Sequence, residues 1–467
     1  MSLLSTPNEI LTHILSFFIP TFPCRKFTHI DPPRGNSARQ RTLSRTSRTC
    51  WRLRCVTLPV LYHTIPATSH KLLKTLAADT YLASLVKAID LSLCGVNMSI
   101  LRGAYRTAVN HRSLSLPPNL DNRLRNEINV GIDFFRDGIT AALYLALLPN
   151  IEEISYIMTG PSSETEFIEF FSQADRMLPR LREFYLNYRE NVNADKIHIS
   201  SIHDLLPTLK TLHVINLSWE LNSHENGPSW SKSSLLPPQL GLKHVNLEAS
   251  TINHAGLSDL LSRSPGLQTL RIEWTHRRRI LDVGGWFKNM GDALRKHGQG
   301  LEELVLNPAK DPTYRYKLRE WITEGPIGSL RELNRLKSLT VPYDSLVSGD
   351  RPRQGNLTQW QRLLEQYRRG RLRLTDILPE SLERLCIMVF QDDEELDLQM
   401  WDLVRERERF PNLQRIQMYR KRGLPIYEFV HGPVDDLVRP DHRIVQEDGF
   451  CEIVLTKEGS TVLSHNV

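Results

Sequence analysis

A short apolar phrase recurs nine times between residues 149 and 422. Each copy reads apolar, two variable residues, apolar, one variable residue, apolar. The alternation at its end predicts a short strand with one buried face. One such strand cannot bury that face alone, so the copies are expected to stack side by side as repeat units. The copies begin at Ile151, Leu181, Leu209, Leu242, Leu267, Leu301, Leu336, Leu382 and Leu413.

Most segments between the copies hold apolar residues at helical spacing, as at Leu257, Leu260 and Leu261. Each unit is therefore predicted to be a strand, a loop and a helix. This predicts an α/β fold, an irregular solenoid with a curved, mainly parallel sheet and helices outside. The array spans 149–422. Before it, 66–148 is predicted to be a helical linker with the first repeat-like units, and after it 423–467 is predicted to be a C-terminal cap with strands at Tyr427–Val430 and Phe450–Leu455.

Alternate positions of each phrase point away from the predicted core. Polar and aromatic side chains there are candidate contacts for a target protein. The alternative is an ordinary solvated sheet surface. The candidates are Tyr185, His213, Asn246, Glu248, Arg271, Glu273, Arg415 and Tyr419.

The first 65 residues differ from the array. Ile10, Leu11, Ile14, Leu15 and Phe18 form a wide apolar stripe, which predicts a helix ended by Pro20. Prolines and basic residues dominate 19–42, which predicts an exposed basic loop. A second helix is predicted over 43–58, with Pro59 ending it.

This N-terminal segment resembles an F-box. Its first half matches at Pro7, Glu9, Ile10, Leu11, Ile14, Leu15, Ser16 and Phe17, and its second half matches around Cys50, Trp51, Leu53, Pro59, Leu61 and Tyr62. The match covers 1–65, and the whole chain is similar to fungal F-box proteins with irregular leucine-rich repeats. It departs from those families at Thr6, where leucine is usual, in the long 19–42 insertion, and in lacking the regular Asn or Cys of each repeat.

The resemblance implies a substrate-recognition subunit of an SCF-type cullin-RING ubiquitin ligase. Its F-box would bind a Skp-type adaptor, its repeats would bind a target protein, and no cofactor would be needed. The implied adaptor-binding residues are Pro7, Glu9, Ile10, Leu11, Ile14, Leu15, Cys50, Trp51, Leu53, Pro59, Leu61 and Tyr62.

Besides an enzyme on a repeat scaffold, whose catalytic residues only the fold would bring together, two non-catalytic functions remain open at this point. One is a leucine-rich-repeat scaffold that never enters a ligase. The other is a basic nucleic-acid-binding repeat protein, suggested by arginine clusters such as Arg277–Arg279 and Arg368–Arg373. The net charge of +6 is mild for 467 residues, and acidic runs such as Asp392–Glu395 interleave, so nucleic acid is the less favoured partner.

Catalytic and metal-binding motifs are missing from the sequence. The six cysteines form no Cys-x-x-Cys pair, and no zinc-protease, Walker, nucleophile-elbow or dinucleotide motif occurs. We therefore expect a non-catalytic protein without a metal. The scattered cysteines favour the cytoplasm or nucleus. The apolar run Ile139–Leu148 is too short to cross a membrane, and we expect it to be a buried helix.

Overall fold

The computed structural model is an α/β protein that divides into two units, Met1–Ser218 and Trp219–Val467, which are described separately. Each unit contains an open sheet whose strands are mainly parallel, as the repeated phrase predicts. The structure describes residues 6–19, 34–66, 70–91, 98–112, 121–122, 125–126, 137–158, 178–188, 208–215, 218–219, 240–274, 286–308, 326–346, 373–389, 394–420, 442–447 and 450–455.

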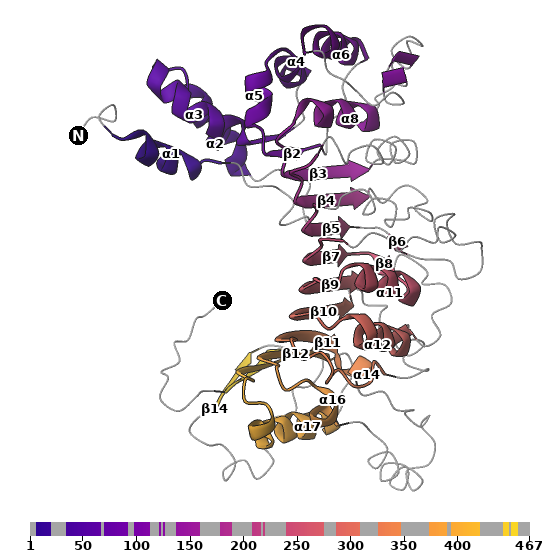
Figure 1. The fold of residues 1–467 in the computed structure, drawn as a ribbon. Helices are drawn as coiled ribbons and strands as arrows, with labels where there is room; N and C mark the ends of the chain where they lie inside the picture. Colours follow the sequence, from indigo (N-terminus) through magenta and orange to yellow (C-terminus); the bar gives the residue numbers. More distant parts are fainter. Residues whose placement is uncertain are drawn as a thin grey trace, which may run out of the picture. The chain divides into compact units, whose positions relative to one another are not determined.

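The first unit begins with a helical module made of α1 (Asn8–Ser16), α2 (Arg34–Thr46) and α3 (Trp51–His63). Figure 1 shows these helices at the N-terminal end of the chain, and both α1 and α2 pack against α3. One apolar cluster holds them together, and Phe18, Ile19, Cys50 and Leu61 pack at its margin. Its buried members are Leu11, Leu15, Leu43, Leu53, Val56 and Val60.

Two local predictions for this module are wrong. Helix α2 already begins at Arg34, inside the segment predicted to be a loop as far as residue 42. Leu43 is its one side chain in the apolar cluster, so α2 lacks the apolar stripe by which a helix is recognised. The predicted 43–58 helix is in fact parts of two helices, and α3 continues past Pro59 to His63. Val56 and Val60 anchor α3 on either side of the proline, and this packing offsets the lost backbone bond.

The rest of the first unit is a parallel sheet with its linking helices. Its strands run in the order β1-β2-β3-β4-β5, which is also their order in the sequence. The apolar run at Ile139 lies in α8 and is buried, as expected. The elements are β1 (Thr64–Pro66), α4 (His70–Ala78), α5 (Thr80–Leu85), β2 (Ala88–Asp90), α6 (Met98–Arg112), α8 (Asp137–Leu147), β3 (Glu153–Met158), β4 (Glu183–Tyr188) and β5 (Thr211–Ile215).

The second unit continues the same pattern, with strand order β7-β9-β10-β11-β12-β13-β15-β14. A short strand, β6 (Ser218–Trp219), lies at the boundary of the two units. The elements of the second unit are β7 (His244–Glu248), β8 (Thr251–Ile252), α11 (His254–Arg263), β9 (Thr269–Trp274), α12 (Trp286–His297), β10 (Glu303–Pro308), β11 (Ser338–Pro342), α14 (Tyr343–Leu346), α16 (Leu374–Ile377), β12 (Arg384–Val389), α17 (Glu394–Arg405), η5 (Arg407–Arg409), β13 (Arg415–Arg420), β14 (His442–Glu447) and β15 (Phe450–Leu455).

Neighbouring strands pair with the same phrase positions opposite each other. In the second unit the third phrase position aligns across β9, β10 and β11 at Thr269, Glu303 and Ser338. Backbone bonds hold this register at the strand starts: the N–H groups of Glu302 and Glu303 both donate to the Gln268 carbonyl, at 2.8 and 2.9 Å. The same pair of hydrogen bonds recurs one strand further on, where the N–H groups of Lys337 and Ser338 both donate to the Glu302 carbonyl. The stacking at this end therefore needs no side-chain ladder of the usual leucine-rich-repeat kind.

The C-terminal strands reverse direction. β13 pairs antiparallel with β15, and β14 pairs antiparallel with β15. The predicted cap strand Phe450–Leu455 is confirmed, whereas His442–Glu447 was not predicted to be a strand. The strand predicted at Tyr427–Val430 lies outside the described residues. Antiparallel strands at this end cover the edge of β13.

No helix in the described part of the chain is long and apolar enough to span a membrane.

Candidate functional site

The N-terminal module exposes large apolar side chains. Ile10, Ile14 and Phe17 of the α1 region are 50%, 44% and 67% exposed, and Trp51 at the start of α3 is 77% exposed. Among the described residues, Tyr81 on α5 is the other large apolar side chain with comparable exposure. Exposed apolar groups that gather in one place, rather than occurring singly, mark an interaction surface.

Helical geometry explains why the three α1 side chains gather. Positions 10, 14 and 17 are spaced four and three residues apart, so they share one side of the helix. Leu11 and Leu15 lie on the other side, inside the module core. The ring of His13 meets the Phe17 ring edge-on, with centroids 5.2 Å apart. We call Ile10, Ile14 and Phe17 the apolar face.

Polar bonds hold the first turns of α1 and α3 together. The Arg52 Nε–H donates to Asn8 Oδ1 at 2.9 Å, and the Arg52 guanidinium also donates to the Thr6 carbonyl. At the N-terminus of α3, the Cys50 Sγ accepts a bond from the Leu53 N–H at 3.5 Å and so caps the helix. Trp51 is thereby held at the end of the module where α1 begins.

The predicted adaptor-binding residues separate into three groups by burial. Leu11, Leu15 and Leu53 are buried in the module core, so they act on a partner only by maintaining the fold. Phe17, which the sequence matched to the F-box pattern but did not single out as a contact, is exposed as well. The exposed residues are Pro7, Glu9, Ile10, Ile14 and Trp51, and the half-buried ones are Cys50, Pro59, Leu61 and Tyr62.

Four of the candidate target contacts form two cross-strand pairs, one in each unit. In the first unit Tyr185 lies opposite His213, with ring centroids 5.6 Å apart. The Tyr185 hydroxyl donates to Glu183 Oε2 at 2.9 Å, and the side chain is only 7% exposed. This tyrosine therefore presents little surface of its own, and His213 presents more.

In the second unit Asn246 lies opposite Arg271. The Arg271 guanidinium is exposed and contacts the Glu303 carboxylate at 2.6 Å across adjacent strands. Glu248 and Glu273 are half-buried and Arg415 is exposed, but their register does not place Arg415 beside the other two. The Tyr419 side chain lies outside the described residues.

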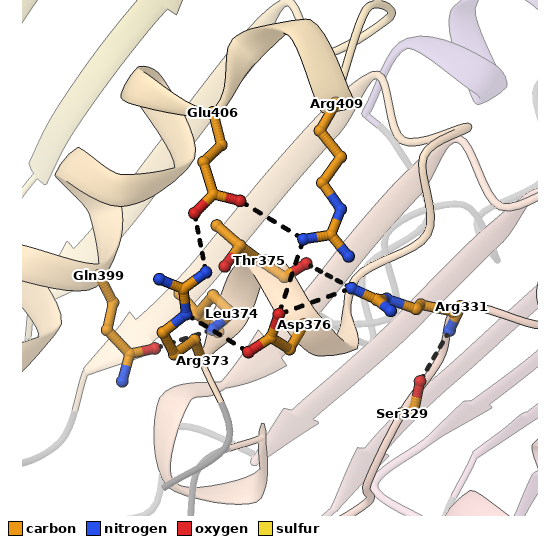
Figure 2. Close-up of polar contacts among 9 residues, drawn as sticks. All are labelled: Ser329, Arg331, Arg373, Leu374, Thr375, Asp376, Gln399, Glu406 and Arg409. Atoms are coloured by element: carbon orange, nitrogen blue, oxygen red, sulfur yellow. Dashed lines mark hydrogen bonds and ion pairs between the residues drawn. The ribbon is translucent and has the colours of Figure 1, made fainter. Parts of the chain in front are cut away.

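Figure 2 shows a charge cluster that the sequence did not predict. Arg373 contacts Glu406 at 2.8 Å and Asp376 at 3.3 Å. Arg331 and Arg409 each lie 3.6 Å from Asp376, and Arg409 also lies 3.4 Å from Glu406. These side chains come from separate segments of the second unit, so no local sequence pattern connects them. The cluster joins the loop before β11, α16 and the segment that ends in η5.

A buried hydrogen bond fixes the segment next to Arg373 of this cluster. Gln399 of α17 is buried, and its Oε1 accepts a bond from the Leu374 N–H at 3.0 Å. Leu374 is the first residue of α16, so the bond satisfies a free donor at the helix start. The cluster therefore belongs to the packing between successive repeat units.

Two observations concern metal binding and thiol reactivity in the described residues. No cluster of three or more His, Cys, Asp or Glu side chains suited to a metal ion is found in the described ranges. Burial raises the pKa of the Cys386 thiol to about 11, although a bond with Thr340 acts in the opposite direction. This thiol is therefore uncharged at neutral pH and a weak nucleophile.

Comparison with known proteins finds no match, either to a protein-family model or to a curated protein.

Proposed function

We propose that this chain is the substrate-recognition subunit of an SCF-type cullin-RING ubiquitin ligase. The apolar face and Trp51 dock onto a Skp-type adaptor, and the repeat array binds the target protein. The observation that carries this proposal is the exposure of Ile10, Ile14, Phe17 and Trp51 on a module whose own core is already filled by other residues. The F-box resemblance of the same segment supports it.

The energetic argument favours a protein that covers this surface. Burying one large aliphatic or aromatic side chain contributes about 1.5–3 kcal/mol. Four such side chains, each at least 44% exposed, are of the apolar kind that forms the centre of protein interfaces. Trp51 has the residue type and the exposure of a binding hot spot.

The mechanism is proximity. The adaptor connects the module to the ligase, and the array holds a target whose lysines then face the conjugating enzyme at a raised local concentration. On the array, His213, Asn246 and the Arg271–Glu303 pair offer hydrogen-bonding groups to the target. In this mechanism the bond-forming chemistry takes place on other subunits.

The test is co-purification of the full-length chain with a Skp-type adaptor. The double variant Ile10→Asp, Ile14→Asp places two carboxylates in the apolar face without touching the module core. We expect it to lose the adaptor while keeping the circular dichroism of the unaltered chain. Tyr81→Asp is the matched control, because Tyr81 is exposed to a similar degree but lies on α5.

Retention of the adaptor by the Ile10→Asp, Ile14→Asp chain would contradict the proposed docking face. Failure of the unaltered, folded chain to bind any Skp-type adaptor would remove the ligase role and leave the scaffold function in its place.

A further inference from the structure

The positive charge of this protein is concentrated in its first 66 residues. The whole chain has 59 Lys and Arg against 53 Asp and Glu. Residues 1–66 contain nine of the basic and two of the acidic residues, so 67–467 contain 50 basic and 51 acidic residues. The repeat region is therefore almost neutral, and the module carries the entire excess.

The described part of the module contains seven arginines and only one carboxylate, Glu9. Arg45, Arg48 and Arg54 are exposed, and each lies without an ion pair or a hydrogen bond from its side chain to the described residues. One carboxylate can neutralise only one of the arginines in the described part of the module. Like charges held close together in a fold repel one another, so such a surface is stabilised by an anionic partner.

These arginines lie on α3 and on the segment before it, close in sequence to the exposed Trp51. Arg54 is three residues after Trp51 on the same helix, so the two side chains share one side of α3. Arg48 lies three residues before Trp51, in the turn that leads into α3, and Arg45 is in the last turn of α2. An apolar centre with charged residues around it is the usual anatomy of a protein–protein interface.

Two other anionic partners fit this arrangement less well. Nucleic acid would pair its phosphates with the arginines but would leave Ile10, Ile14 and Phe17 in water. A helix that lies on a membrane surface carries its basic residues on its own polar side, whereas α1 has no lysine or arginine. Here the apolar face and the positive charges belong to different helices of one folded module.

We propose that the surface which covers the apolar face is an acidic protein surface, with carboxylates placed opposite Arg45, Arg48 and Arg54. This inference rests on the proposed function, because the adaptor is the partner that occupies this face. Opposite charges then accelerate the encounter, while the apolar contacts determine how long the complex lasts. The proposal identifies the partner by its chemistry and adds a kinetic role for the arginines.

The test measures association and dissociation rates of the full-length chain on an immobilised Skp-type adaptor, between about 0.05 and 0.5 M salt. For the unaltered chain we expect an association rate that falls steeply with salt, while the dissociation rate changes little. The triple variant Arg45→Glu, Arg48→Glu, Arg54→Glu should associate at least about tenfold more slowly at low salt. Replacing the same arginines with glutamine should give an intermediate rate.

The matched control reverses three exposed arginines of the repeat region, in the variant Arg180→Glu, Arg335→Glu, Arg384→Glu. It changes the net charge by the same amount, so an effect of total charge alone would slow both triple variants equally. We expect the control to associate at nearly the rate of the unaltered chain. Equal slowing of both variants would overturn the proposal.

The remaining outcomes separate this inference from the proposed function. Adaptor binding that depends on Ile10 and Ile14 but not on salt or on the three arginines would overturn the inference and leave the proposed function intact. Absence of adaptor binding at any salt would overturn both. The same triple variant is also tested against a DNA duplex and phosphatidylserine vesicles. If it loses either of these ligands while adaptor association is unchanged, the arginines serve that ligand and the inference is wrong.

Discussion

The N-terminal module and the repeat region differ in how far their apolar side chains are buried and their charged side chains are paired. In the repeats, the apolar phrase residues such as Leu304 and Leu339 are completely buried. Charges in the repeats are paired across successive strands, as in Lys87–Glu152 and Lys337–Glu302, both at 2.8 Å. The module, by contrast, leaves the apolar face in solvent, and its described part contains seven arginines and one carboxylate.

This difference shows which apolar and charged surfaces are covered by the chain itself and which are left for another molecule. A repeat unit gains its missing apolar contacts and its counter-charges from the next unit along the chain. The module fills its core with six buried residues, yet the outer side of α1 and the start of α3 receive no such cover among the described residues. A surface that the chain does not complete is where a second protein is expected to bind.

The largest expected effect is a loss of stability in the module alone, caused by a substitution in its core. Leu43 is fully buried and is the contribution of α2 to that core. Leu43→Ala should cost about 2–5 kcal/mol, enough to unfold a small module while the repeats stay folded. Hydrogen exchange should then show fast exchange over 34–63 and unchanged protection in β9 to β13. Equal loss of protection in both regions would show that module and repeats unfold together.

A substitution in the second unit tests the opposite case, in which the repeats lose stability and the module keeps its binding. A Cβ atom on Gly291 of α12 would lie 1.8 Å from the Ile327 carbonyl oxygen, which also accepts a bond from Arg295. Gly291→Ala should therefore destabilise this unit by about 1–3 kcal/mol and leave adaptor binding unchanged. Thermal melting followed by circular dichroism is the measurement.

Gly103→Ala on α6 is the control, because nothing lies within 4 Å of its added Cβ. Alanine is the better helix former, so this variant should be neutral or up to about 1 kcal/mol more stable. An equal loss of stability in both variants would show that the close approach at Gly291 is not the cause.

A smaller, pH-dependent effect is expected where the module meets the first repeat strands. Burial, and secondarily Lys87, lowers the pKa of His63 below its ordinary 6.5, although Glu152 acts in the opposite direction. At this residue the folded chain then binds fewer protons than the unfolded chain, so the contribution of His63 to the free energy of unfolding is constant above pH 6.5 and falls as the pH drops below it. His63→Gln should reduce this loss in urea unfolding between about pH 7 and pH 5. An identical pH profile in both proteins would rule out His63 as its source.

The smallest effect belongs to the paired charges of the repeats. Lys87 and Glu152 are each about one-third exposed, and the bond from Lys87 lowers the pKa of the Glu152 carboxyl. A double-mutant cycle with Lys87→Met and Glu152→Gln should give a coupling of about 0.2–1 kcal/mol, and less at high salt. A coupling that salt leaves unchanged would indicate that the pair acts through packing rather than charge.

Much of the fold follows from local patterns in the sequence. The phrase that begins at Leu301 predicts a short strand with one buried face, and β10 (Glu303–Pro308) with its buried Leu304 and Leu306 agrees with that prediction. Such a prediction succeeds because strand alternation is a property of a few consecutive residues, and every unit repeats it. The start of α2 at Arg34 was missed, because a helix with so few buried side chains has almost no apolar periodicity.

By itself, the sequence determined the α/β repeat architecture, the apolar residues of the module and the uneven distribution of charge. The tertiary structure alone decided which of those apolar residues face outward: Ile10 and Leu11 are neighbours in one helix, yet one is half exposed and the other is buried against α3. It also decided that Arg331, Arg373 and Arg409 meet around Asp376 and Glu406. The physical reason is the same in both cases, because burial and pairing depend on segments that are distant in the chain and become neighbours only when it folds.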